Sequence, residues 1–181
     1  STHEEPRKQI GDSKTPVGMF WLSAVFSKDP SYEKKCKMPF IHVKPTTEVI
    51  HDPRSIYYNQ IVNTDQIVNK DWNASEKMHE VDAYELGIVI DHNSPVEDPN
   101  LGAFTFIHEW KAPHKPTTGS VALSAENLKQ IVEWLDIEKR PTIVIMPLKT
   151  HRDYILTWSL HRMPFEEYLA PEEFLQRPRR K

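Results

Sequence analysis

The feature that most constrains the fold is a series of short apolar runs, each only long enough for one strand. Met19–Phe26, Tyr84–Ile90 and Thr142–Met146 are continuous, rich in β-branched or aromatic residues, and bounded by turn-forming residues. Runs of about four to eight residues with this composition are typical of buried β-strands. Phe40–Val43 and Thr46–Ile50 are shorter candidates bounded by prolines. A chain made mainly of such pieces must pair them into sheets.

One segment has a helical period instead. Ser124 precedes it, and a serine hydroxyl in that position accepts hydrogen bonds from the free N–H groups of a first helical turn. The apolar residues that follow recur at i, i+3, i+4 and i+7, and are Leu128, Ile131, Val132 and Leu135. This spacing places one apolar face against a sheet. We therefore expect a mainly β fold, a sandwich or barrel, with one covering helix over about 124–136 and short peripheral helices.

Other stretches are less regular. Tyr57–Ile67 is ambiguous because Asn and Asp interrupt its apolar residues, and Asp71–Met78 fits either a helical turn or a packed loop anchored by Trp72. Tyr154–Leu160 has the composition of one more strand, and a short helix is expected after Pro171. None of these alternatives changes the expected fold class.

Composition limits the function classes. The chain has 181 residues, enough for one domain with a sizeable core, and a formal net charge of −3, which gives no electrostatic reason to expect nucleic acid. No apolar run approaches the length of a membrane span. A single cysteine, Cys36, excludes an intrachain disulfide. We predict a flexible lead over 1–10, a catalytic-type domain over 11–147 and an extension over 148–181.

Two neighbouring motifs suggest chemistry. Phe104–Trp110 predicts a strand that delivers His108, and Pro116–Ser124 predicts a turn that presents the Ser120 hydroxyl, with a helix following at once. The strand must turn back as a hairpin to bring the two side chains together. A base beside a nucleophile-type side chain is the layout of covalent acyl transfer. The alternative is a hydrogen-bonded core histidine beside an ordinary turn glycine, Gly119.

Further candidates surround this pair. The Gly119 and Ser120 backbone N–H groups could form an oxyanion hole. Substrate-binding or pocket-wall roles are open to Tyr84, His92, Asn93, Trp110, Thr117 and Thr118, for each of which a structural role is equally compatible with the sequence. The histidines show no helical His-x-x-x-His spacing and no paired carboxylate motif, so neither a metal nor another cofactor is predicted.

The order of the motifs resembles the L,D-transpeptidase catalytic domain family of bacterial cell-envelope enzymes. The segments that carry the resemblance are Gly11–Phe20, Ser55–Asn59, Asp71–Met78, Tyr84–Asn93, Phe106–His108 and Pro116–Ser124. In that branch of the family the turn has the sequence Pro-Thr-x-Gly-Cys, so Ser120 stands where the nucleophilic cysteine would be. The family domain usually starts with further strand sequence, so an amino-terminal portion is expected to be missing here.

The resemblance implies peptidoglycan chemistry in the periplasm or outside a bacterial cell. Such an enzyme attacks the carbonyl between an L-centred diamino acid and the terminal D-alanine of a tetrapeptide stem. A stem amine or water then resolves the acyl-enzyme, which gives a 3,3 cross-link or a trimmed tripeptide. His108 would be the general base. The implied partners are stem peptides, with no nucleic acid and no membrane span, and the implied fold is a mostly antiparallel β-sandwich with a covering helix.

Serine at the nucleophile position changes this expectation. A thiol beside an imidazolium can ionise near neutral pH, whereas a serine hydroxyl has no accessible anion and needs concerted proton removal. Three interpretations remain open: a substitution that makes an inactive protein, a natural variant that binds without reacting, and a working serine enzyme. The sequence thus predicts a transpeptidase or carboxypeptidase scaffold that is inactive in this form. The alternative is a non-catalytic module that binds peptidoglycan stem peptides.

Overall fold

The computed structural model describes residues 8–94, 97–113, 115–154 and 157, in two units divided between Ile145 and Met146. The division falls two residues before the boundary predicted at 147. The second unit contributes helix α2 (Leu148–Tyr154), in which the His151 N–H donates to the Pro147 carbonyl at 3.0 Å. Tyr154 is the last residue of α2. The prediction that a strand starts at Tyr154 is therefore wrong for that residue. The helix predicted after Pro171 lies outside the described residues.

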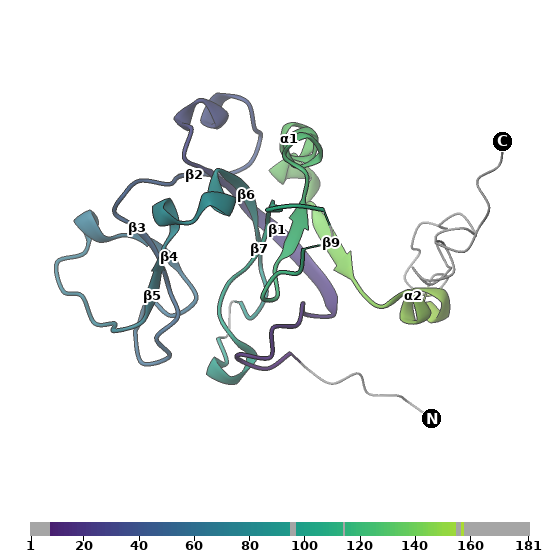
Figure 1. Cartoon of the computed structure of the whole chain (residues 1–181), viewed down its shortest axis with the longest axis horizontal. Coiled ribbons are helices and arrows are strands. Elements are labelled where there is room, and N and C mark those ends of the chain that lie inside the picture. The colour runs from purple at the N-terminus through teal and green to yellow at the C-terminus, as the bar shows by residue number, and fades with distance from the viewer. Residues whose placement is uncertain (1–7, 95–96, 114, 155–156, 158–181) are drawn as a thin grey trace. The chain divides into compact units, whose positions relative to one another are not determined.

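A six-stranded mixed sheet forms the centre of the first unit (Figure 1). Its main path runs β2–β1–β6–β7–β8, and β9 pairs with the first half of β1. The pairs β1–β2 and β7–β8 are parallel, and the other pairs of this sheet are antiparallel. The strands are β1 (Gly18–Ser27), β2 (Phe40–His42), β6 (Leu86–Ile90), β7 (Thr105–Glu109), β8 (Val121–Leu123) and β9 (Thr142–Ile145). The predicted mainly β class is confirmed for the described residues.

A second, antiparallel sheet has β3 at its centre, with β4 and β5 on either side. Its strands are β3 (Thr47–Ile50), β4 (Ile61–Asn63) and β5 (Ser75–Lys77). The stretch Asp71–Met78 is thus a loop that runs into a strand, and the helical-turn alternative is wrong for its middle. Trp72 does anchor that loop, because it is 5% exposed and its indole N–H donates to Glu48.

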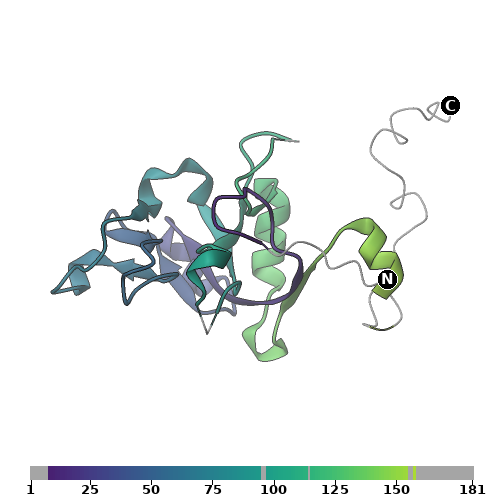
Figure 2. The same cartoon turned by 90° about the horizontal axis from the view of Figure 1, so that it is seen from below.

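The two faces of the central sheet carry different cores. On one face α1 (Ala125–Trp134) covers an aliphatic cluster that includes Val25, Ile88 and Leu128. Phe26 and Phe106 belong instead to an aromatic cluster that is shared with residues of the second sheet. In both views β3, β4 and β5 are grouped away from α1 (Figures 1 and 2). The unit is therefore layered as helix, central sheet and small sheet.

The covering helix begins where the sequence predicted. The Ser124 hydroxyl accepts a hydrogen bond from the Asn127 N–H at 3.3 Å, which satisfies one free donor of the first turn. Leu128 and Val132 are fully buried, and Leu135 just after the helix is 2% exposed. The apolar face of α1 is therefore the face that packs on the sheet.

Short 3-10 turns connect many of the strands. They are Pro30–Lys34, Thr64–Gln66, Met78–Glu80, Asp82–Tyr84, Pro99–Leu101 and Ile137–Lys139. Among the helices in the described part of the chain, none has the length and apolar character needed to span a membrane.

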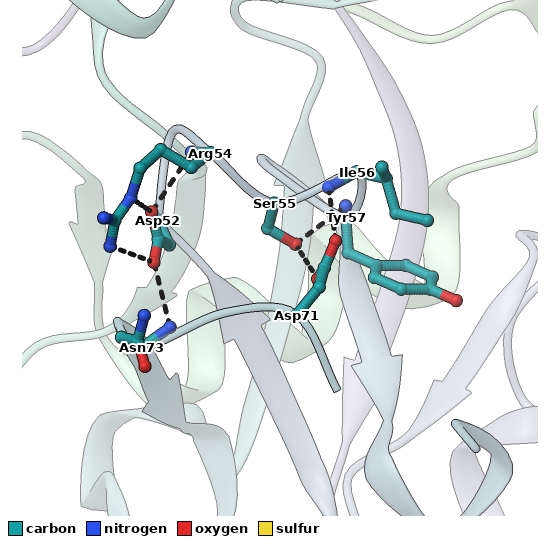
Figure 3. Close-up of polar contacts among 7 residues, drawn as sticks. All are labelled: Asp52, Arg54, Ser55, Ile56, Tyr57, Asp71 and Asn73. Atoms are coloured by element: carbon teal, nitrogen blue, oxygen red, sulfur yellow. Dashed lines mark hydrogen bonds and ion pairs between the residues drawn. The ribbon is translucent and has the colours of Figure 1, made fainter. Parts of the chain in front are cut away.

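Two carboxylates hold the loops beside the small sheet in place (Figure 3). Asp52 pairs with the Arg54 guanidinium at 3.2 Å and accepts the Asn73 N–H at 2.9 Å. Asp71 accepts the Ser55 hydroxyl at 2.6 Å and the Ile56 N–H at 3.0 Å. The segments 52–56 and 71–73 overlap the stretches on which the family resemblance rests. Here both serve as a structural clamp.

Candidate functional site

The strand of His108 and the turn of Ser120 lie side by side because β7 and β8 pair in parallel. Ile107 is opposite Val121, and His108 is opposite Ala122. The predicted hairpin is therefore wrong: residues 110–120 leave the end of β7 and return to the start of β8, as a parallel pair requires. The helix also does not follow the turn at once, because the three residues of β8 come first.

A cavity of about 270 Å³ opens beside this pair of strands. Five of the predicted site residues line it, and they come from segments that are far apart in the sequence: Tyr84, His108, Thr118, Gly119 and Ser120. The proposed base and the proposed nucleophile position thus face one space, although they come from different strands of the chain.

His108 is held in one tautomer. Its Nδ1 lies 2.8 Å from the Glu109 carbonyl oxygen. A carbonyl oxygen only accepts hydrogen bonds, so the proton of a neutral imidazole is on Nδ1 and Nε2 carries the free lone pair. The Tyr84 ring packs edge-on against the imidazole, with the ring centroids 5.7 Å apart. The side chain is thus oriented to accept a proton at Nε2.

Ser120 directly precedes β8, and its side chain, not its backbone, bonds to the neighbouring strand β7. Its Oγ accepts the Phe106 backbone N–H at 3.2 Å. A backbone donor aimed at this atom would stabilise negative charge there, because hydrogen bonding to a charged form favours that form. One backbone donor is thus aimed at the Oγ of residue 120.

The turn before Ser120 needs glycine at position 119. Gly119 has φ of +128°, and a β-carbon there would lie 2.9 Å from the Lys14 carbonyl oxygen. The Gly119 N–H already donates to Thr117 Oγ1 at 3.3 Å, and the Thr117 hydroxyl donates to the Ser120 carbonyl. Thr117 therefore ties the turn together and is not among the residues that line the cavity. The Ser120 N–H is the better candidate for an oxyanion donor.

Tyr84 and Glu76 form the wall behind His108. The Tyr84 hydroxyl donates to Glu76 Oε1 at 2.9 Å. Burial, followed by the neighbouring Glu76 carboxylate, raises the pKa of Tyr84 far above its ordinary value. The phenol thus stays protonated at physiological pH, and its role is to donate a hydrogen bond and to pack.

Besides Thr117, three predicted residues are not part of the cavity lining. His92 is 8% exposed and packs edge-on against Phe20, and burial, followed by the Lys8 charge, lowers its pKa. Asn93 has φ of +57°, and its side chain bonds the Asp98 and Gly102 backbone and so shapes the loop that leads to the cavity. Trp110 follows β7, and its N–H donates to the Leu123 carbonyl at 2.9 Å.

The sequence did not identify several residues of the cavity wall. Lys8, His51 and Phe104 line it, as does Glu76. Phe104 has a strained φ of +21°, and its N–H donates to Asn59 Oδ1 at 2.6 Å. The motif that contains Glu76 was a usable signal, whereas nothing in the local sequence of Lys8 places it here. Residues 1–7 of the predicted flexible lead lie outside the described residues.

No group of three His, Cys, Asp or Glu side chains in the described ranges is arranged to hold a metal ion. His114 lies outside those ranges. The arrangement around His108 comprises an oriented imidazole, a backbone donor aimed at residue 120, and one lysine and one carboxylate on the walls.

Comparison of the chain with protein-family models, with curated protein sequences and with solved structures found no match.

Proposed function

We propose that the chain is an L,D-transpeptidase or L,D-carboxypeptidase scaffold for peptidoglycan stem peptides, with serine at the nucleophile position. The observation that carries the proposal is that His108, Gly119 and Ser120 line one cavity. The family resemblance of the sequence supports the finer assignment of an L,D-transpeptidase-like fold. A bacterial periplasmic or extracellular location and stem-peptide partners belong to the same proposal.

The mechanism would be acyl transfer through a thiolate at position 120. The thiol proton passes to His108 Nε2, which leaves a thiolate. The sulfur then attacks the carbonyl of the L-centred residue, and the developing oxyanion accepts a hydrogen bond from the backbone N–H of residue 120. The bond to the terminal D-alanine breaks, and His108 Nε2 gives its proton to the leaving amine. Water or a stem amine then attacks the thioester, loses a proton to His108 and releases the acyl group.

With serine the same site lacks a ready nucleophile. The hydroxyl accepts the Phe106 N–H as a neutral group, and ionising it would cost far more than ionising a thiol. The chain in this form is therefore proposed to be catalytically silent.

The test is to restore the thiol. A Ser120→Cys variant in a Cys36→Ser background, so that only one thiol is present, is incubated with purified tetrapeptide muropeptides. We expect a mass increase equal to the muropeptide acyl group that remains after loss of D-alanine, together with released D-alanine. The same double variant with His108→Gln should give neither product. If the His108-containing variant forms no adduct and no product, the catalytic assignment is wrong.

A second candidate function is a module that binds stem peptides without reacting. The neutral hydroxyl, already held by the β7 backbone, favours it. This function predicts saturable muropeptide binding that Ser120→Cys leaves unchanged, and no turnover by either form. Calorimetric titration of both forms separates it from the first function.

A further inference from the structure

The Lys8 side chain reaches the cavity between two glycines. A β-carbon at Gly119 would lie 3.5 Å from the Lys8 Nζ, and a β-carbon at Gly102 would lie 3.9 Å from its Cε. Both glycines have positive φ, +128° and +83°, so other residues rarely adopt their conformation. The side chain is only 12% exposed. Because neither glycine has a side chain, Lys8 fits between them and lies next to the Ser120 turn.

Asp12 holds this lysine in place. It accepts the Lys8 ammonium, together with the Gln9 N–H at 2.8 Å and the Lys14 N–H at 2.9 Å. The hydrogen bond from Lys8, followed by those two backbone N–H groups, holds the pKa of Asp12 well below its ordinary value. An ammonium has three donors, and among residues 8–94, 97–113 and 115–154 Asp12 accepts one of them, which leaves donors for a bound anion.

No other lysine or arginine is among the described residues that line the cavity. Glu76 is the carboxylate of the lining, and it accepts the Tyr84 hydroxyl. Lys8 is therefore the side chain of the lining that an anionic group of a ligand would contact, next to the Thr118–Ser120 turn. The same group would be repelled from the Glu76 wall.

We propose that Lys8 is a specificity-determining residue that binds the free carboxylate of the C-terminal residue of the peptide substrate. The inference rests on the proposed function and deepens it. In such a peptide the carboxylate lies one residue beyond the scissile carbonyl, a spacing of about 3.8 Å between Cα atoms. The Lys8 Nζ lies 3.5 Å from the position that a β-carbon on Gly119, the residue before the nucleophile position, would take. A contact between Lys8 and the carboxylate would favour a bond that is one residue from a free chain end.

The carboxylate takes no part in bond making. When the carbon–nitrogen bond breaks, the leaving amine takes its proton from His108, and the carboxylate leaves with the departing amino acid. Lys8 holds that group by charge and hydrogen bonding in both the bound peptide and the transition state. A peptide that ends in a carboxamide would lose this ion pair and keep its other contacts.

Binding to the serine form tests the proposal without any turnover. The probes are a stem tetrapeptide with a free C-terminal carboxylate and the same peptide with a C-terminal carboxamide, titrated by calorimetry. We expect the acid to bind about tenfold more tightly than the amide, because the ion pair is charge-assisted and shielded from water. Lys8→Met should remove this preference, and Lys8→Arg should keep most of it. Thermal unfolding of each variant establishes that it is folded.

The control is Asp12→Asn, which removes the partner of Lys8 and leaves the ammonium in the chain. The acid preference should persist in this variant. The proposal is overturned if acid and amide bind equally to the parent chain, or if Lys8→Met keeps the preference. Absence of acylation by the Ser120→Cys variant, with the acid preference intact and dependent on Lys8, would instead contradict the proposed reaction alone.

Discussion

The two faces of the central sheet achieve stability in different ways. Under α1 the contacts are aliphatic, and the residues there, such as Val25, Ile88 and Leu128, are fully buried. The opposite face is aromatic, with the Phe26 and Phe106 rings edge-on at 5.0 Å, and it opens into the cavity. Rings with few rotatable bonds lose little freedom on packing. We infer that the first face holds the fold together and that the second face orients the site.

The small-sheet side and the α1 side also differ in their polar side chains. Beside the small sheet, Glu48, Asp52 and Asp71 are ionised side chains tied to loops. The aliphatic cluster under α1 is built from apolar side chains. The small-sheet side should therefore weaken once the pH falls below the ordinary pKa values of these carboxyl groups.

The largest expected effect is on the α1 side. Leu128→Ala removes a fully buried side chain and should lower the free energy of unfolding by about 3 kcal/mol, since the cavity left behind adds to the lost burial. Peptide affinity, measured where the variant is still folded, should not change. Urea unfolding at pH 7 measures the first quantity, with the exposed Gln130→Ala as the control. A large loss of affinity would show that the two faces are not independent.

On the aromatic face, Gly87→Ala should affect both stability and the site. A β-carbon at Gly87 would lie 2.1 Å from Phe26 Cζ, so the ring must move, and this ring contacts Tyr84 and Phe106. We expect a loss of about 2 kcal/mol from overpacking, with weaker peptide binding. Adding Phe26→Leu should recover part of both losses. Unchanged peptide affinity in the folded single variant would contradict the orienting role of this face.

Low pH should reduce the stability that Glu48 gives to the small-sheet side of the molecule. Burial alone would raise the pKa of Glu48, but hydrogen bonds from Ser75, Trp72 and Lys70 outweigh it and lower the pKa below its ordinary 4.5. Its stabilising effect is therefore full above pH 4.5 and is lost as the pH falls through the lower, folded-state value. Glu48→Gln should cost about 2 kcal/mol at pH 7.

That cost should shrink as the pH falls from 4.5 through the lower, folded-state pKa of Glu48, because the parent chain then takes up a proton there and loses the charge. Unfolding by urea at a series of pH values measures it. A difference between the two proteins that is independent of pH would exclude ionised Glu48 as the cause.

The smallest effect concerns the start of α1. Ser124→Ala removes the hydroxyl that accepts the Asn127 N–H and should cost about 1 kcal/mol, whereas Ser124→Asp should restore the stability. Thermal unfolding compares the three proteins. Equal melting temperatures would mean that this cap contributes nothing to the stability of the helix on the aliphatic face.

Local patterns predicted a large part of this structure. The β1 and β6 strands and the capped helix followed from apolar runs and from helical spacing, because those signals lie within one element. The β8 strand was missed, since its three half-buried residues show too short a pattern. The parallel pairing of β7 with β8 and the position of Lys8 depend on how distant segments meet. Such tertiary contacts cannot be predicted from the composition or the residue spacing of a single segment.

The most direct test of the central claim is the acidity of a thiol at position 120. In the Cys36→Ser, Ser120→Cys variant, the rate of reaction with a thiol reagent is followed against pH. Since the Phe106 N–H and the His108 imidazole both favour the anion, we predict that the introduced thiol has a pKa at or below about 7.5, against about 8.5 for an ordinary cysteine. Adding His108→Gln should raise this pKa again. A thiol pKa of about 8.5 or more that does not depend on His108 would contradict the account.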